Sequence, residues 1–296
     1  MLKAMSYYGI GQTPILNLAP INGNRVLLKM ESKNFLGSVK ARTAYGLVKG
    51  LQVPRKRIII ESTSGNLGLA LNFFCREEER PFLCLLDETV IAAKLEYLKE
   101  QGVDYEIVPT LNGMDGRSSR MKRAEELTKQ GHHFWVNQYD NEDGIKVHQQ
   151  TTGIEIIGQT QGNVTCVFCA VGSGGTIIGI GECFKSLRIN ATVFGVEPYG
   201  STIFSVEDKP YITAGAGLRG QPGNIKRHPE IVGRSTTIHD DISVNKCNEL
   251  YTRYNADVGI TTGMAYAAAE QYCHATTGET VVIIAADGRE MYHDYL

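Results

Sequence analysis

Short β-rich runs alternate with amphipathic helical patterns along almost the whole chain, and this alternation constrains the fold more than any other feature. Strands of four to seven residues separated by helices of ten or more are typical of βαβ units, in which parallel sheets carry helices on both faces. The sequence therefore predicts an α/β fold. The expected strands are Val26–Lys29, Ile58–Glu61, Phe82–Leu86, Tyr105–Pro109, Thr165–Val171, Thr192–Glu197 and Thr280–Ala285, and the clearest helices are Ile91–Gly102, Ser118–Gly131 and Gly174–Leu187.

Length and charge exclude several classes of protein. At roughly 150 residues per domain, 296 residues indicate two domains or one large α/β unit with an insertion, and a boundary is expected near residue 145. Thirty basic against 32 acidic residues argue against a dominant role on nucleic acid or membrane surfaces. No apolar run approaches the roughly 18 residues needed to span a bilayer, and the N-terminus has no signal-peptide pattern. We expect a soluble, cytoplasmic protein.

The seven cysteines are interpreted as buried thiols. Cys166 and Cys169 form a C-x-x-C pair, but they lie in a predicted strand, where residues three apart face opposite sides. No second pair and no nearby histidine completes four ligands. Core thiols are therefore favoured over a metal site, and no metal is expected.

Three segments are candidates for chemistry, and the first contains Lys40 in Asn34-Phe-Leu-Gly-Ser-Val-Lys-Ala-Arg42. A lysine in the first turn of a helix is unfavourable for the helix dipole. It is either an ordinary surface lysine or a Schiff-base lysine, whose amine must be partly desolvated and deprotonated to attack an aldehyde.

The second segment, Glu61-Ser-Thr-Ser-Gly-Asn-Leu-Gly68, connects a strand to a helix. Its small hydroxyl-bearing residues leave several N–H donors free at a helix N-terminus, which suits a carboxylate or phosphate. Ordinary N-capping by Ser or Thr is the alternative, but the segment has more donors than one cap requires.

The third segment is the glycine-rich Val171-Gly-Ser-Gly-Gly-Thr176, which also opens a helix. Glycines allow backbone amides to approach a phosphate, although a plain strand-to-helix turn explains the pattern equally well. A dinucleotide-binding dehydrogenase would need an acidic residue about 20 positions further on, near Asn190, where there is none. A monophosphate is therefore favoured over NAD.

In this order and spacing the three segments resemble the fold type II pyridoxal-phosphate (PLP) enzymes of the cysteine synthase and cystathionine β-synthase family. The resemblance extends from Gly11-Gln-Thr-Pro14 to the C-terminus. It implies two three-layer α/β/α domains with mostly parallel twisted sheets, similar to the tryptophan synthase β-subunit. Residues 1–35 and 146–296 would form the larger, phosphate-binding domain, and residues 36–145 the smaller, carboxylate-binding domain.

The resemblance also implies roles for individual residues. Lys40 is expected to be the catalytic Schiff-base lysine of the PLP cofactor. The residues expected to bind the cofactor with it are Asn66, Gly172, Ser173, Gly174, Gly175, Thr176, Thr262 and Asp287. The residues expected to bind substrate are Ser62, Thr63, Ser64, Asn66, Gln138, Arg120 and Arg219.

One departure from the family concerns the ring nitrogen of the cofactor. Where the family has a serine that contacts this nitrogen, the chain reads Ile284-Ala-Ala-Asp287-Gly, so Ala286 or Asp287 faces the ring. A neutral pyridine favours β-elimination, whereas a carboxylate would protonate it and strengthen the electron sink. Both interpretations stay open.

Several motifs resemble one branch in particular, the synthase that joins O-phosphoserine to glutamate in 2,3-diaminopropionate synthesis. Among them are Trp135-Val-Asn-Gln-Tyr-x-Asn141 and Gly200-Ser-Thr-Ile-Phe204. Arg120 falls where that branch has an arginine for the substrate phosphate, although a solvated helix face would explain it as well. Arg117 is three residues away on the same predicted face, and Arg219 lies in the long segment Gly200–Arg234, which is expected to cover the site.

The resulting hypothesis is β-replacement on an O-activated L-serine through an α-aminoacrylate intermediate, as in cysteine synthase. Phosphate or acetate would leave, and the nucleophile would be sulfide, a thiol, or an amine such as glutamate or ammonia. A non-catalytic regulatory subunit would explain the missing serine, but the intact Lys40 argues against it. The expected partners are small amino-acid substrates and a second copy of the chain in a homodimer, with neither nucleic acid nor membrane.

Overall fold

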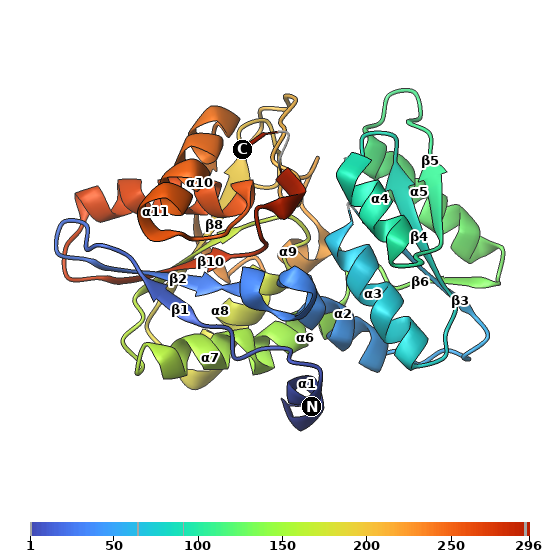
Figure 1. The fold of residues 1–296 in the computed structure, drawn as a ribbon, viewed down its shortest axis with the longest axis horizontal. Coiled ribbons are helices and arrows are strands. Elements are labelled where there is room, and N and C mark those ends of the chain that lie inside the picture. The colour runs from blue at the N-terminus through green and yellow to red at the C-terminus, as the bar shows by residue number, and fades with distance from the viewer. Residues whose placement is uncertain (1, 64, 91, 293–294) are drawn as a thin grey trace.

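The chain folds into two sheets, each covered by helices on both faces (Figure 1). The computed structural model describes residues 1–296 except 1, 64, 91, 293 and 294. The helices are α1 (Leu2–Tyr7), α2 (Lys40–Lys49), α3 (Asn66–Glu77), α4 (Ala92–Glu100), α5 (Gly116–Lys129), α6 (Glu142–Gln150), α7 (Thr152–Gln159), α8 (Gly175–Leu187), α9 (Gly223–Arg227), α10 (Asp240–Tyr254) and α11 (Ile260–Ala275).

The larger sheet has six strands in the order β1-β2-β10-β7-β8-β9. Only the pairing of β1 with β2 is antiparallel, and the other four pairings are parallel. Helices α10 and α11 cover one face, and α6, α7 and α8 cover the other. The strands are β1 (Ile15–Asn17), β2 (Arg25–Met30), β7 (Cys166–Ala170), β8 (Thr192–Pro198), β9 (Val232–Ile238) and β10 (Thr280–Ala285).

The smaller sheet is entirely parallel, with the order β5-β4-β3-β6. Helices α2, α3 and α4 pack on one face and α5 on the other. Its strands are β3 (Ile58–Ser62), β4 (Phe82–Asp87), β5 (Tyr105–Val108) and β6 (His133–Trp135). The α/β class with two three-layer units is thus confirmed, while the expected domain boundaries stay a prediction.

Burial on both faces explains why the central strands read as continuous apolar runs. In β7, Cys166 and Phe168 join the core beneath α11, while Val167 and Cys169 join the core beneath α8. The two cysteines therefore face opposite sides, as expected. All seven cysteines are free and buried, and the described residues contain no cluster of metal-ligating side chains.

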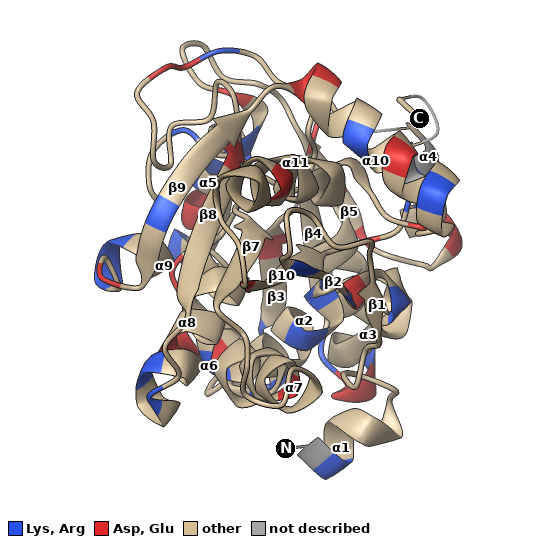
Figure 2. Ribbon diagram, turned by 90° about the vertical axis from the view of Figure 1, so that its left-hand side faces the viewer, with Lys and Arg blue, Asp and Glu red and all other residues tan. Residues whose placement is uncertain are grey.

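All seven expected strands are present within one or two residues of their predicted ends. Acidic and basic residues are interspersed over the elements, in keeping with the balanced charge (Figure 2). No helix in the described part of the chain is long and apolar enough to cross a membrane.

Candidate active site

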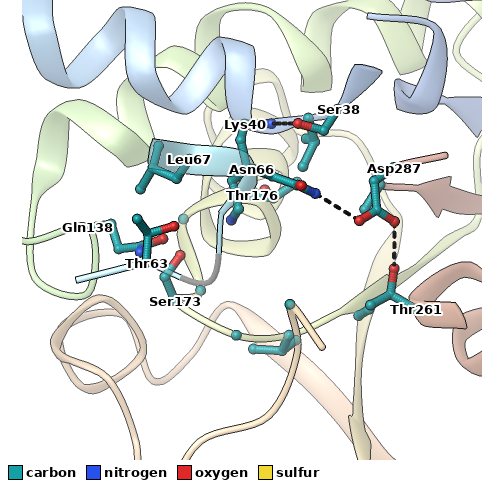
Figure 3. A pocket seen from close by; sticks show the side chains of 18 of the residues that line it. Ser38, Lys40, Thr63, Asn66, Leu67, Gln138, Ser173, Thr176, Thr261 and Asp287 are labelled. Carbon is teal, nitrogen blue, oxygen red and sulfur yellow. Dashed lines mark hydrogen bonds between the residues drawn. The ribbon is translucent and has the colours of Figure 1, made fainter. Parts of the chain in front are cut away.

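A cavity lies where segments that follow β3, β7 and β10 meet, at the carboxyl ends of these parallel strands. It spans about 960 Å³, including space open to solvent. In parallel sheets this edge is where ligands usually bind. Residues from all three candidate segments of the sequence line the cavity (Figure 3).

Three helices begin at the cavity wall. Lys40 is the first residue of α2, Asn66 the first of α3 and Gly175 the first of α8. Each N-terminus has free N–H groups and the positive end of a helix dipole, so the cavity attracts anionic groups from three directions.

Lys40 is half-buried and lines the cavity. Burial lowers the pKa of its amine, the condition that attack on an aldehyde requires. Its backbone N–H donates to Ser38 Oγ over 3.3 Å (Figure 3), and the preceding Val39 N–H donates to the Ala286 carbonyl over 2.8 Å. The start of α2 is therefore attached to the segment that follows β10.

A buried ion network fixes α2 just beyond Lys40. Arg42, fully buried, donates to both oxygens of Glu31 over 2.8–2.9 Å and to both oxygens of Glu155 over 2.7 Å. Lys29 Nζ also pairs with Glu155, at 2.7 Å. Burial alone would raise the pKa of Glu31, but Arg42 outweighs it and lowers that pKa to about 2.

The segment after β3 brings two expected substrate-binding residues to the wall. Thr63 and Asn66 line the cavity, and Gln138 joins them, with its Nε2 donating to the Ser62 carbonyl over 3.0 Å. Ser62 itself is buried behind the wall, and its hydroxyl has no hydrogen-bond partner among the described residues. Ser64 lies outside the described residues.

Glu61 supports this segment from beneath. Its carboxylate accepts hydrogen bonds from the Ser62 and Gln138 N–H groups over 2.7 and 2.9 Å and from Trp135 Nε1 over 3.0 Å. Burial raises the pKa of Glu61 to about 7.

The glycine-rich segment after β7 forms the opposite wall, with Gly172, Ser173, Gly174, Gly175 and Thr176 all lining the cavity. Gly174 adopts φ +84°, and a Cβ there would approach Ile225 to 2.9 Å, so this turn requires glycine.

His148 lies behind the glycine-rich segment and connects it to α2. It is fully buried, bonds to Thr43 and Thr152 at 2.9 Å, and approaches Thr176 at 3.4 Å. Burial lowers the pKa of His148 to about 3, so it is a neutral link between α2 and the glycine-rich segment.

Asp287 brings a buried carboxylate to the cavity. It accepts hydrogen bonds from Asn66 Nδ2 over 2.8 Å, from the Tyr292 hydroxyl over 2.7 Å and from Thr261 Oγ1 over 3.5 Å (Figure 3). Burial raises the pKa of this carboxyl. Ala286 also lines the cavity, but it has no polar group to offer.

Three cations complete the wall: Lys94, Arg117 and Arg120. Arg120 is buried, donates to the Thr63 carbonyl over 2.7 Å and pairs with Asp87 at 3.0 Å. Sequence reasoning overlooked Lys94, because nothing in its predicted helix distinguishes it from a surface lysine.

Besides Ser62, two further expected residues do not line this cavity. Thr262 is buried away from the cavity, with its hydroxyl lacking a partner among the described residues, and its neighbour Thr261 lines the wall instead. The helical rotation between successive residues at the start of α11 explains this difference. Arg219 is exposed, pairs with Asp208 at 3.0 Å, and lines an adjoining outer cavity.

The residues present fit a phosphate-bearing aldehyde such as PLP. Residues 172–176 would hold the phosphate, since their free N–H groups stand at a helix N-terminus and a Cβ at Gly172 would come within 2.9 Å of the Gly215 carbonyl. Lys40 has the amine that the aldehyde needs.

Comparisons with known proteins agree with this fit. The sequence profile of a family described as pyridoxal-phosphate dependent enzyme matches residues 7–287. A cysteine synthase of Staphylococcus aureus is 30% identical over 293 residues, which cover 96% of this chain and 93% of that protein.

Solved structures show the same likeness. An O-acetylserine dependent cystathionine β-synthase from Helicobacter pylori superposes with a TM-score of 0.88 at 26% identity, over 97% of this chain and 95% of that one. A hydrogen sulfide-producing enzyme from Fusobacterium nucleatum gives a TM-score of 0.87 at 26% identity, over 96% and 97%.

Proposed function

This chain belongs to the family of pyridoxal-phosphate dependent enzymes, and we propose that it replaces the β-substituent of an O-activated L-serine, with O-phosphoserine as the preferred ester. It is a PLP-dependent enzyme of the cysteine synthase type that catalyses β-substitution. One observation carries the proposal: Lys40, with its lowered pKa, shares a cavity with three helix N-termini and two arginines.

When bound, PLP withdraws electrons from the α-carbon of the amino acid, and the protein positions the reacting groups around it. Thr63, Asn66 and Gln138 hold the α-carboxylate of the substrate beside the N-terminus of α3. Lys40 Nζ removes the α-proton, and the same amine later returns a proton to that carbon. A lowered pKa increases the fraction of this amine that is unprotonated and able to act as a base.

The leaving group is the finer part of the proposal. The Helicobacter pylori relative is named for its dependence on O-acetylserine. In this chain two guanidinium groups line the cavity, and a phosphate dianion entering a dry pocket needs such fixed cations because leaving it unpaired is costly. Arg117 donates to the Gly217 carbonyl and bonds to Tyr211, so it also connects α5 to the covering segment. An acetyl ester needs no such charge.

The two arginines have different expected effects. Arg120 holds the Thr63 carbonyl as well as lining the cavity, so Arg120→Ala should slow both esters and O-phosphoserine more. Arg117→Met should impair O-phosphoserine more than O-acetylserine, by about 10- to 150-fold in the ratio of the two kcat/KM values, the usual cost of a lost charged hydrogen bond. Arg123→Met is the matched control, because Arg123 lies on the same helix and pairs with Glu106 outside the cavity.

The experiment measures release of phosphate from O-phosphoserine and of acetate from O-acetylserine by the purified holoenzyme. Faster phosphate release, lowered by Arg117→Met and unchanged by Arg123→Met, is the expected result. A preference for the acetyl ester with Arg117→Met indifferent to both would assign the chain to the O-acetylserine-dependent enzymes. Release of neither group would overturn β-substitution on a serine ester.

A further inference from the structure

An outer cavity adjoins the active-site cavity and spans about 1350 Å³, including space open to solvent. The two cavities share four lining residues, namely Lys94, Arg117, Arg120 and Gly215. A molecule that passes from the outer to the inner cavity therefore meets three cations at the shared wall. Segment 208–215, from the long region predicted to cover the site, lines the outer cavity.

Lys94 differs from its two cationic neighbours because no carboxylate or carbonyl of a described residue pairs with its amine. It is 4% exposed, yet no hydrogen bond or ion pair between described residues involves its amine. Arg120, by contrast, pairs with Asp87, and Arg117 bonds to the Gly217 carbonyl. The Lys94 stem lies against Gly65, where a Cβ would come within 2.3 Å of its Cδ. Its amine lies 5.6 Å from the centre of the Tyr292 ring.

Such a lysine is costly for the folded protein. The amine borders both cavities, but burial of the side chain still removes part of its hydration, and no carboxylate among the described residues replaces it. Burial accordingly lowers the pKa of Lys94, and the nearby Asp287 only partly opposes that effect. A bound anion would supply the missing partner. A ligand that brings an anion to the shared wall would therefore offset the cost of burying Lys94.

We propose that Lys94 binds the anionic group of the second substrate, so that the outer cavity holds a nucleophile the size of an amino acid that carries a carboxylate. This inference rests on the proposed β-substitution. The two arginines already meet the leaving phosphate, which leaves Lys94 for a second anion. A sulfide ion would need no cavity of this size.

The reaction balances with such a nucleophile. The Cβ–O bond of the serine ester breaks, and its electron pair leaves with the oxygen as phosphate. The lone pair of the nucleophile's sulfur or nitrogen forms the new bond at Cβ, and that atom loses its proton. The α-proton taken by Lys40 returns to the α-carbon, so the products are the β-substituted amino acid and hydrogen phosphate.

A pair of thiols that differ only in charge tests the inference. With the serine ester held constant, 3-mercaptopropionate is compared with its neutral amide, 3-mercaptopropionamide, and kcat/KM is measured for each. The wild-type enzyme should prefer the carboxylate. Lys94→Met keeps the stem against Gly65 and should reduce that preference by about 10- to 150-fold, whereas Lys94→Arg should retain most of it. Lys99→Met on the same helix, exposed and paired with Glu96, is the control.

The outcomes separate this inference from the proposed function. Turnover of both thiols without preference, or a preference that Lys94→Met leaves unchanged, would overturn the role of Lys94 while leaving β-substitution intact. If Lys94→Met released phosphate more slowly than wild type before any thiol is added, Lys94 would be binding the leaving phosphate, and the inference would be overturned. No release of phosphate or acetate by the wild type would instead overturn the proposed function.

A stability measurement adds a readout independent of turnover. Because Lys94 is disfavoured in the folded state, Lys94→Met should unfold at the same or a higher urea concentration than wild type at pH 7. A variant that is less stable than wild type would show that Lys94 has a structural partner, which would overturn the inference.

Discussion

Arg42→Met should destabilise this protein more than removal of any exposed charge, because it leaves two buried carboxylates without their partner. The guanidinium makes four hydrogen bonds of 2.7–2.9 Å to Glu31 and Glu155. The side chains of Arg42 and Glu31 are both fully buried. Breaking a buried pair by removing one member typically costs about 3–5 kcal/mol. Glu155 keeps Lys29 as a partner, so most of the cost falls on Glu31.

The size of this effect makes it easy to measure. For chains of 150–250 residues about 1 kcal/mol corresponds to roughly 2–4 °C in Tm, so a loss of about 3–5 kcal/mol predicts a fall of roughly 6–20 °C. The pH dependence has a definite sign as well. Since the pKa of folded Glu31 is about 2, its stabilisation is present above the ordinary value of 4.5 and is lost as the pH falls toward 2. Arg42→Met should therefore lose stability less steeply in acid than wild type.

The assay is urea unfolding of the holoenzyme at pH 7 and at pH 4, followed by circular dichroism. Arg42→Lys should fall between wild type and Arg42→Met, because lysine keeps the charge but not the planar fork. Lys49→Met is the control, since Lys49 lies on the same helix in a half-exposed pair with Glu78 and should change stability by less than about 1 kcal/mol. An Arg42→Met variant within 1 kcal/mol of wild type would refute the reasoning about buried charge.

Two further predictions concern the cofactor side of the cavity. Lys40→Ala should purify without covalently bound PLP and fail to complete turnover, as mass spectrometry and product analysis would show; full activity would contradict the assignment of Lys40. Asp287→Ala should change the pH dependence of the bound-cofactor absorbance and slow proton removal by about 10²-fold, because a positioned proton-linked group contributes about that much. A spectrum and rate like those of wild type would show that Asp287 has only a structural role, through its hydrogen bonds with Asn66 and Tyr292.

The buried strands were predictable because burial on both faces leaves a strong pattern. Residues 58–60 and 281–285 are continuous apolar runs, and the structure has both within central parallel strands. The strands missed by the sequence analysis lie at sheet edges. The strands Ile15–Asn17 and His133–Trp135 have only three residues each. The strand Val232–Ile238 is longer, but most of its residues are polar and at least partly exposed. Edge strands bury little, so their sequences show little hydrophobic periodicity.

The site was predictable where a motif follows directly from the chain path. Lys40, Asn66 and the segment 172–176 each open a helix after a strand or turn, and all line one cavity. The position of Lys94 at the cavity could not be predicted from such a motif. Lys94 lies within α4, whose sequence is ordinary, and its burial depends on the packing of α4 against Gly65. The homodimer and the cytoplasmic location stay predictions.

The cavity contains two buried ionisable groups that a purely structural interior would avoid. Burial raises the pKa of Asp287 and lowers the pKa of Lys94, so each is disfavoured in its charged form. They attract one another, and each reduces the other's shift, but no ion pair joins them within the described structure. Asp287 instead accepts hydrogen bonds from Asn66, Thr261 and Tyr292, which fix its orientation toward the cavity. Among the described residues, Lys94 is held by the contact of its stem with Gly65 and by the Tyr292 ring, whose centre lies 5.6 Å from its amine. In the proposed function the cofactor's ring, which can accept a proton, lies beside Asp287 and an anion lies beside Lys94, and the separate supports of the two side chains keep these positions apart.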